Sequence, residues 1–162
     1  MRRLIMTVFL PVLFLALAFP SPAQPGPPGT AVKSGQATFT FNGTALKFGN
    51  VTGTFNQSYG YTAIGLNFSK DAKTATGTHL SINVMVQGPG EVDLTQAFGN
   101  GIGMWWKSTI FTYEKGKSAC TVVLTKVSAT EVEGTAECPT LNELHGSGTA
   151  SLRDVKFVAR TD

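Results

Sequence analysis

The feature that most constrains this chain is a period of two in its hydrophobic pattern, which begins at residue 37 and continues to the C-terminus. In the segment 80–86, every second residue from Leu80 onward is Leu, Ile or Val. This period places apolar side chains on one face of a β-strand and polar side chains on the other. Only 14% of the residues are charged, whereas Gly, Thr, Ser, Val and Phe are abundant. Both observations favour strands joined by tight turns over helices.

Turn-forming residues divide this region into eight to ten short strands. Asn42-Gly43, between the segments 37–41 and 44–48, is the strongest hairpin signal, since both residues readily adopt positive φ. The other strands are expected at 51–55, 59–68, 80–86, 91–94, 104–113, 119–127, 131–138 and 148–159, the fifth to seventh of these forming a meander. The pattern predicts an all-β fold, an antiparallel β-sandwich of immunoglobulin-like or jelly-roll kind. A closed barrel is the alternative, and a single helical turn fits near 141–144.

Cys120 and Cys138 are the only cysteines, and the pattern around them predicts a cross-strand disulfide. If Val127 pairs with Glu131 across a three-residue loop, Cys120 lies directly opposite Cys138. Both side chains then share the apolar face of the hairpin, which is the core face. The bond would close a loop of roughly 19 residues and contribute about 3 kcal/mol on chain-entropy estimates. Because there is no Cys-x-x-Cys motif, a structural role is expected rather than a redox one.

Residues 1–23 have the pattern of a secretory signal peptide. Two arginines are followed by an apolar run, and Ser21-Pro22-Ala23 fits the small-x-small pattern that signal peptidase cuts. The run is short for a membrane span, and prolines interrupt it. We therefore expect cleavage after Ala23, export to the periplasm or the medium, and no stable membrane insertion of the processed chain. Residues 24–36 are expected to form a flexible Pro/Gly-rich leader, and 37–160 the β-sandwich domain.

Charge and residue spacing argue against several classes of function. Without Arg2 and Arg3 the chain has 11 Lys and Arg against 10 Asp and Glu. A nearly neutral chain without a basic stripe is not expected to bind nucleic acid. The sequence predicts no catalytic residue, because it lacks a Gly-x-Ser-x-Gly motif and a phosphate loop. His79 and His145 are far apart and have no ligand partners at metal-binding spacing, so neither a metal nor another cofactor is expected.

Three aromatic residues are the candidate contacts for a ligand or partner. Counting back from the Lys115-Gly116 turn places Trp105 in the core near the disulfide and Trp106 on the opposite face. A tryptophan beside a Gly-rich loop, here residues 95–103, can stack on a sugar or contact a protein. Tyr59 and Tyr61, which flank a glycine, form a second candidate. The alternative is that Trp106 packs in a minor cluster of a two-layer sandwich.

Several strand and turn motifs resemble those of small exported bacterial β-sandwich domains of uncharacterised function, which are often lipoproteins. The matching segments are Ala37-Thr-Phe-Thr-Phe-Asn-Gly43, Gly90-Glu-Val-Asp-Leu94, Cys120-Thr-Val-Val-Leu-Thr-Lys-Val127, Val132-Glu-Gly-Thr135 and Val155-Lys-Phe-Val158. The resemblance implies a β-sandwich fold and covers nearly all of the processed chain. It implies no catalytic residue, and the lipid-anchor cysteine of such proteins is missing here.

These observations favour a secreted or periplasmic, non-catalytic binding or structural protein whose partner is an unknown protein or a glycan. One alternative is a carbohydrate-binding module that uses the exposed aromatic residues. Others are a secreted enzyme and a barrel that holds a small lipophilic ligand. Four asparagines begin Asn-x-Ser/Thr triplets that a eukaryotic secretory pathway would recognise, so both a bacterial and a eukaryotic source stay open. They are Asn42, Asn50, Asn56 and Asn67.

Overall fold

The computed structural model describes residues 29–71, 77–95 and 99–162, and within them the chain is all β and antiparallel. The predicted all-β class is confirmed. The signal peptide predicted at 1–23 lies outside the described residues. The strands are β1 (Thr30–Ala31), β2 (Ser34–Phe41), β3 (Thr44–Phe48), β4 (Asn50–Ser58), β5 (Tyr61–Ser69), β6 (His79–Val86), β7 (Gly90–Glu91), β8 (Gly101–Trp106), β9 (Thr109–Thr112), β10 (Ala119–Val127), β11 (Glu131–Glu143) and β12 (Thr149–Arg160). They outnumber the eight to ten expected because β1 was not predicted and the strand expected at 104–113 is two strands, β8 and β9.

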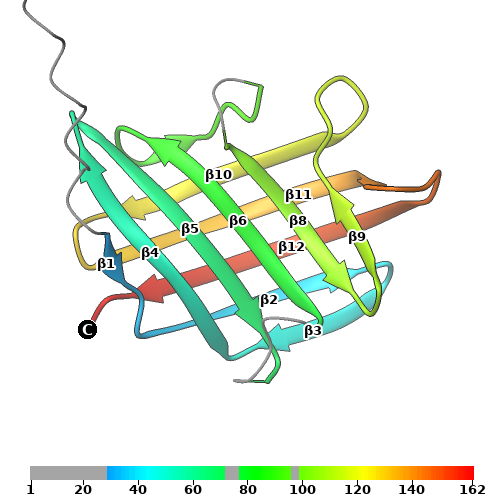
Figure 1. Cartoon of the computed structure of the whole chain (residues 1–162), viewed down its shortest axis with the longest axis horizontal. Coiled ribbons are helices and arrows are strands. Elements are labelled where there is room, and N and C mark those ends of the chain that lie inside the picture. The colour runs from blue at the N-terminus through cyan, green and yellow to red at the C-terminus, as the bar shows by residue number, and fades with distance from the viewer. Residues whose placement is uncertain (1–28, 72–76, 96–98) are drawn as a thin grey trace, which may run out of the picture.

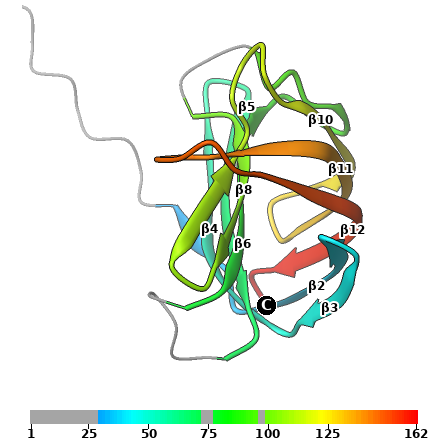
Figure 2. The ribbon, with the colours of Figure 1, turned by 90° about the vertical axis from the view of Figure 1, so that its right-hand side faces the viewer.

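Ten of the strands form one hydrogen-bonded path, in the order β1-β4-β5-β6-β8-β9-β11-β12-β2-β3, while β10 pairs with β11 and with β7 beside it. The sheet is folded into two layers, as Figure 1 shows from the front and Figure 2 from the side. The front layer contains β4, β5, β6, β8 and β9, and the back layer contains β10, β11, β12, β2 and β3. Two residue pairs between β9 and β11, Thr112 with Asn142 and Phe111 with Glu143, join the layers. Five of the nine neighbouring pairs along this path also follow one another in the chain, and the other four, β1–β4, β6–β8, β9–β11 and β12–β2, do not.

The hydrophobic core fills the space between the two layers. Every second residue of β5 and β6 points into it, and the same holds for the central strands of the back layer. Phe68 of β5 meets Phe157 of β12 with ring centroids 6.0 Å apart. The largest fully buried side chains are Phe41, Phe48, Phe68, Leu66, Leu80, Ile82, Ile102, Met104, Leu124, Leu141, Leu152 and Val122.

Two hairpins turn through a pair of residues that both have positive φ. The expected Asn42-Gly43 turn is one of them, with φ of 46° and 79°. The other is Tyr59-Gly60, with φ of 50° and 79°, where the sequence pattern had suggested the start of a strand. Asn is favoured at such a position, while tyrosine pays a steric cost there. Tyr59 is therefore held at the tip of the β4–β5 hairpin.

The N-terminal part of the domain begins earlier than the predicted boundary at residue 37. Thr30 and Ala31 pair with β4, and β2 starts at Ser34, so the stretch expected to be a flexible leader contains strand residues. Val32 N donates to Gly53 O at 2.9 Å. Lys33 N donates to Arg160 O at 2.8 Å. This stretch therefore connects β4 of the front layer with β12 of the back layer.

The expected meander of three strands between residues 104 and 138 is wrong. A turn at Lys107-Ser108 splits its first strand into the β8–β9 hairpin, and β9 pairs with β11 rather than with β10. Lys107 has a φ of 56°, a conformation that the sequence did not signal with Asn or Gly. The helical turn suggested near 141–144 is also absent, since β11 continues as a strand to Glu143.

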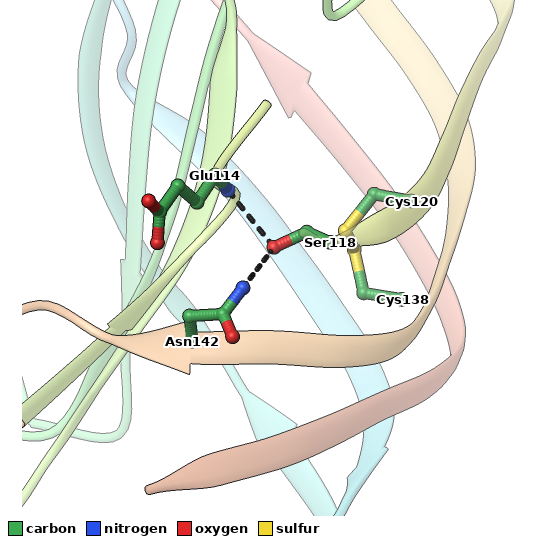
Figure 3. Close-up of a disulfide and its surroundings, with 5 residues drawn as sticks. All are labelled: Glu114, Ser118, Cys120, Cys138 and Asn142. Carbon is green, nitrogen blue, oxygen red and sulfur yellow. Dashed lines mark hydrogen bonds between the residues drawn. A yellow bond between two sulfur atoms is a disulfide. The ribbon is translucent and has the colours of Figure 1, made fainter. Parts of the chain in front are cut away.

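The predicted disulfide between Cys120 and Cys138 is confirmed (Figure 3). Val122 and Ala136 are opposite one another, as the predicted register required. At the end of the hairpin, however, Val127 pairs with Val132 and not with Glu131, because an irregularity between Leu124 and Lys126 shifts the register by one residue. Close to the bond, Ser118 Oγ accepts hydrogen bonds from Glu114 N at 2.9 Å and Asn142 Nδ2 at 2.8 Å.

Candidate binding face

The outer face of the front layer is the candidate site, and β4, β5, β6 and β8 build it in rows. Side chains on this face alternate with core residues along each strand. Residues that are opposite one another in the ladders form four rows across the sheet. These rows are Asn50–Ser69–His79–Trp105, Thr52–Asn67–Ser81–Gly103, Thr54–Gly65–Asn83–Gly101 and Asn56–Ala63–Met85.

The two layers differ sharply in charge. None of the residues in the four described strands β4, β5, β6 and β8 is Asp, Glu, Lys or Arg. The outward positions instead supply amides and hydroxyls, each of which both donates and accepts hydrogen bonds. The strands of the back layer carry Lys47, Lys126, Glu131, Glu133, Glu137, Glu143, Arg153, Asp154, Lys156 and Arg160.

A shallow hollow of about 330 Å³ lies in the middle of the neutral face. It exists because Ala63 and Gly65 are small and stand between larger polar neighbours such as Thr54. Asn83 Oδ1 lies over Gly65, where a Cβ would come within 3.2 Å of it. Asn83 Nδ2 donates to Ser81 Oγ at 3.0 Å, which fixes the plane of the amide. The hollow thus presents ordered polar groups above a floor of small residues.

Two further hollows adjoin the first one. A hollow of about 540 Å³ shares Met85 and Asn100 with it, and a third, of about 360 Å³, shares Tyr61 and Gln87 with the second. Asn100 holds the junction in place, since its Oδ1 accepts a hydrogen bond from Met85 N at 2.7 Å. The three hollows are thus neighbours from the centre of the face to the Tyr59 hairpin tip, and together they are called the depression.

Carboxylates are found only at the rim of this depression, in its middle part. Glu91 and Asp93 line the second hollow, while the first and third are lined by uncharged residues. Asp93 Oδ1 accepts hydrogen bonds from Thr95 N at 2.8 Å and Thr95 Oγ1 at 2.6 Å. An anionic ligand would meet these negative groups, so the depression disfavours an anion.

Tyr59 and Tyr61, both predicted contact residues, lie together at one end of the depression and line the third hollow. Tyr59 is 99% exposed and Tyr61 44% exposed. Met85, in the next row of outward residues, is 45% exposed. Three large side chains with exposed apolar surface on a neutral face are typical of an interaction surface, where aromatic residues and Met are enriched.

The structure reverses the predicted positions of the two tryptophans. Trp105, expected in the core, is 38% exposed on the outer face, where its ring stacks on His79 with centroids 4.8 Å apart and planes inclined by 24°. Trp106, expected to contact a ligand or partner, points inward and packs against Phe41 of the back layer, with ring centroids 5.1 Å apart. The alternative of a packed Trp106 describes the structure better. His79 Nδ1 lies 2.8 Å from Gly77 O, which orients the stacked imidazole.

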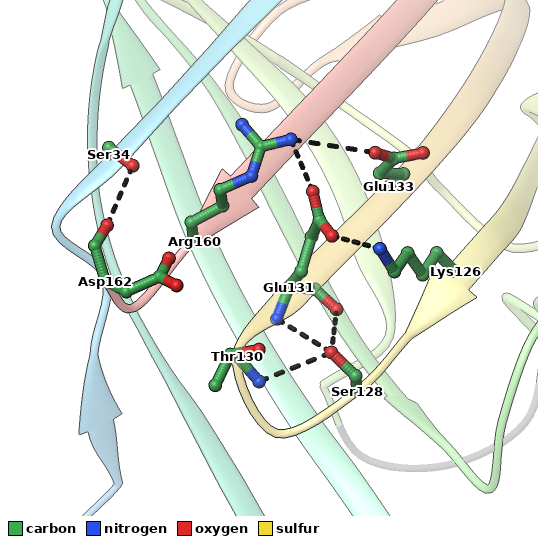
Figure 4. Close-up of polar contacts among 8 residues, drawn as sticks. All are labelled: Ser34, Lys126, Ser128, Thr130, Glu131, Glu133, Arg160 and Asp162. Atoms are coloured by element: carbon green, nitrogen blue, oxygen red, sulfur yellow. Dashed lines mark hydrogen bonds and ion pairs between the residues drawn. The ribbon is translucent and has the colours of Figure 1, made fainter.

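Charged side chains gather on the opposite layer, around Glu131 (Figure 4). Glu131 pairs with Lys126 and with Arg160, and Glu133 lies 3.8 Å from Arg160. The hydrogen bond from Lys126 lowers the pKa of Glu131, and the same bond raises the pKa of Lys126. These contacts are those of a solvated strand face that balances its own charge.

No metal centre is assembled in the described part of the chain. Within residues 29–71, 77–95 and 99–162, no group of three or more His, Cys, Asp or Glu side chains is placed to hold a metal ion. Those residues also contain no helix long and apolar enough to cross a membrane. His145 is exposed in the β11–β12 connection, far along the chain from His79, which is buried at the neutral face.

Sequence reasoning identified the two tyrosines but missed the face to which they belong. The available signal was the absence of Asp, Glu, Lys and Arg from residues 48–69 and 74–90. No protein-family model matches the chain, and no match was found among the curated proteins or the solved structures. The resemblance to exported bacterial β-sandwich domains therefore stays a prediction.

Proposed function

We propose that this protein is an exported, non-catalytic binding module whose ligand lies on the outer face of β4, β5, β6 and β8. The observation that carries the proposal is the depression on this neutral face, which ends in exposed tyrosines. Folding alone does not require a large exposed ring such as that of Tyr59, since Asn or Gly would form the same turn at lower cost. A contact with a ligand gives the ring a role.

The residue types support binding rather than chemistry. Amides and hydroxyls such as those of Asn83 and Thr54 recognise a ligand by hydrogen bonds, but they do not act as general acids or bases near neutral pH. Export is supported by the disulfide, because disulfides persist in oxidising compartments.

A sedimentation assay with insoluble material tests this proposal. The processed protein, made in a bacterial periplasm, would be incubated separately with cellulose, chitin, peptidoglycan sacculi and protein-bearing envelope membranes. Ala63→Arg places a long side chain in the central hollow, and Thr135→Arg places the same side chain on an exposed strand position of the other layer. We expect at least one material to retain the protein, Ala63→Arg to abolish retention, and Thr135→Arg to leave it unchanged.

Three outcomes would overturn the proposal. The first is that none of the four materials retains the protein. The second is that both arginine variants bind as the parent does, which would move the site elsewhere. The third is turnover of a retained material by the parent protein, measured as released soluble product, because the module would then be an enzyme.

A further inference from the structure

We infer that the ligand of the neutral face is an uncharged oligosaccharide chain, an inference that rests on the proposed function and specifies its ligand. The first argument is chemical. Sugar hydroxyls donate and accept hydrogen bonds, and so do the outward side chains of Asn67, Asn83 and Thr54. An acidic ligand would require a cation, which these four strands do not supply, and it would meet Glu91 and Asp93 in the middle hollow.

The shape of the depression favours a chain over a single small molecule. Each of its three hollows shares lining residues with the next one. The first contains Thr54, the first and second share Met85, and the third contains Tyr59. The part along β4, from Thr54 to Ser58, spans roughly 13 Å at the usual strand rise. The hollows are open, so several linked rings can lie along the face without entering an enclosed cavity.

The aromatic residues supply the remaining element of sugar recognition. A pyranose ring has an apolar face that stacks on tyrosine or tryptophan, while its hydroxyls reach polar groups at the edge. Tyr61 and Tyr59 lie at one end of the depression, and Trp105 lies at the opposite end of the same sheet face. Rings at both ends, with amides between them, match an extended neutral glycan.

A protein partner is the competing occupant, and two features count against it. Interfaces between proteins are enriched in arginine and have an apolar centre. The centre of this face contains Ala63, Gly65, Asn83 and Ser81, and arginine is absent from the four strands. The small polar centre fits a hydrated sugar chain better.

Calorimetric titration with defined glycans tests the inference. The probes are soluble oligomers of cellulose, chitin, xylan and mannan as neutral chains, with oligogalacturonate and heparin as acidic ones. We expect at least one neutral oligomer to bind, with an affinity that does not change between low and high salt, since no ion pair is involved. The acidic chains should bind more weakly or not at all.

Two pairs of variants assign the binding to this face. Tyr59→Asn removes the ring but suits the positive φ of the turn, so it should be at least as stable as the parent and bind about tenfold more weakly. Tyr59→Phe should retain binding. Asn83→Asp puts a charge in the central hollow and should weaken binding about tenfold or more, whereas Gln36→Glu makes the same change in a hollow of the other layer and should not.

The outcomes separate the two proposals. If no neutral oligomer binds, or if Tyr59→Asn and Asn83→Asp bind as the parent does, the glycan inference is overturned. If only the protein-bearing envelope membranes retain the protein in the sedimentation assay, and Ala63→Arg abolishes that retention, the glycan inference fails while the binding module stands. If nothing is retained there, both fail.

Discussion

The ring of Phe157 lies directly over the backbone of Gly134 at the centre of the back layer. The two residues are opposite one another in the β11–β12 ladder, and a Cβ on Gly134 would come within 2.7 Å of Phe157 Cζ. It would also come within 2.6 Å of Val123 O, a backbone atom that cannot rotate away. Phe157 in turn packs against Phe68 of the front layer. Glycine is thus required where the ring that connects the two layers crosses β11.

We expect Gly134→Ala to destabilise the protein by about 1–3 kcal/mol, the usual range for overpacking a core. Urea unfolding followed by tryptophan fluorescence measures this change. Gly49→Ala is the matched control, because a Cβ at Gly49 meets nothing within 4 Å. Equal unfolding midpoints for the two variants would show that the strand shifts to admit the methyl group.

Removal of the disulfide should lower stability without preventing the fold. Cys120 and Cys138 are 18 residues apart in sequence, and the bond restricts the unfolded chain. The double variant Cys120→Ala, Cys138→Ala should lose about 3 kcal/mol, while its strand content by circular dichroism stays the same. Reduction of the parent protein should give a similar loss. An unfolding midpoint identical to that of the oxidised parent would contradict this prediction.

The ion pairs of Glu131 should make stability depend on pH. The pKa of Glu131 is lowered in the folded protein, chiefly by the hydrogen bond from Lys126. The contribution of Glu131 to the free energy of unfolding is therefore complete above the carboxyl pKa of the unfolded chain. It is lost as pH falls through the lower pKa that Glu131 has in the folded protein. The pKa of Lys126 is raised, so the contribution of Lys126 is lost only as pH rises through its folded value.

Glu131→Gln should accordingly be less stable than the parent near neutral pH and approach the parent in acid. Thermal unfolding across an acid-to-neutral pH series measures the difference. Glu133→Gln is the control, because the ion pair of Glu133 is the longer 3.8 Å contact with Arg160, and this variant should lose less stability near neutral pH. A difference in unfolding temperature between Glu131→Gln and the parent that stays the same across the pH series would contradict this prediction.

The segment from Gly29 to Gln36, which includes the first three residues of β2, should be needed for full stability, although the sequence pattern assigned it to a leader. A chain that starts at residue 37 loses the backbone hydrogen bonds of Val32 and Lys33 to β4 and β12, and the buried Val32 side chain. Compared with a chain that starts at residue 29, it should be less stable by roughly 2 kcal/mol or more. Identical unfolding curves for the two chains would restore the predicted boundary at 37.

The sequence allowed prediction of those features that depend on local pattern. The Asn42-Gly43 hairpin and the Cys120–Cys138 pair follow from alternation and turn chemistry over short spans. The disulfide register was right although Val127 pairs with a different residue than expected, because the irregularity in β10 lies between the cysteine pair and the turn. Prediction was reliable where only neighbouring strands were involved.

The tryptophans show where such reasoning fails. Across the turn at Lys107-Ser108, Trp105 is opposite Ile110 and Trp106 is opposite Thr109. Odd-numbered residues of β8 therefore share a face with even-numbered residues of β9, so a count that continued straight through the turn reversed the assignment. The pairing of β9 with β11 is a tertiary contact for which the chain carries no local signal.

The pairing of β2 with β12 has a consequence for how the molecule is made. Asn42 and Ser151, at one end of this ladder, are 109 residues apart in sequence, and the backbone nitrogen of each donates a hydrogen bond to the other residue. The whole stretch between them must therefore leave the ribosome before β2 acquires this neighbour. Such distant pairing slows folding and leaves the early hairpins without their partner strand until β12 has been made.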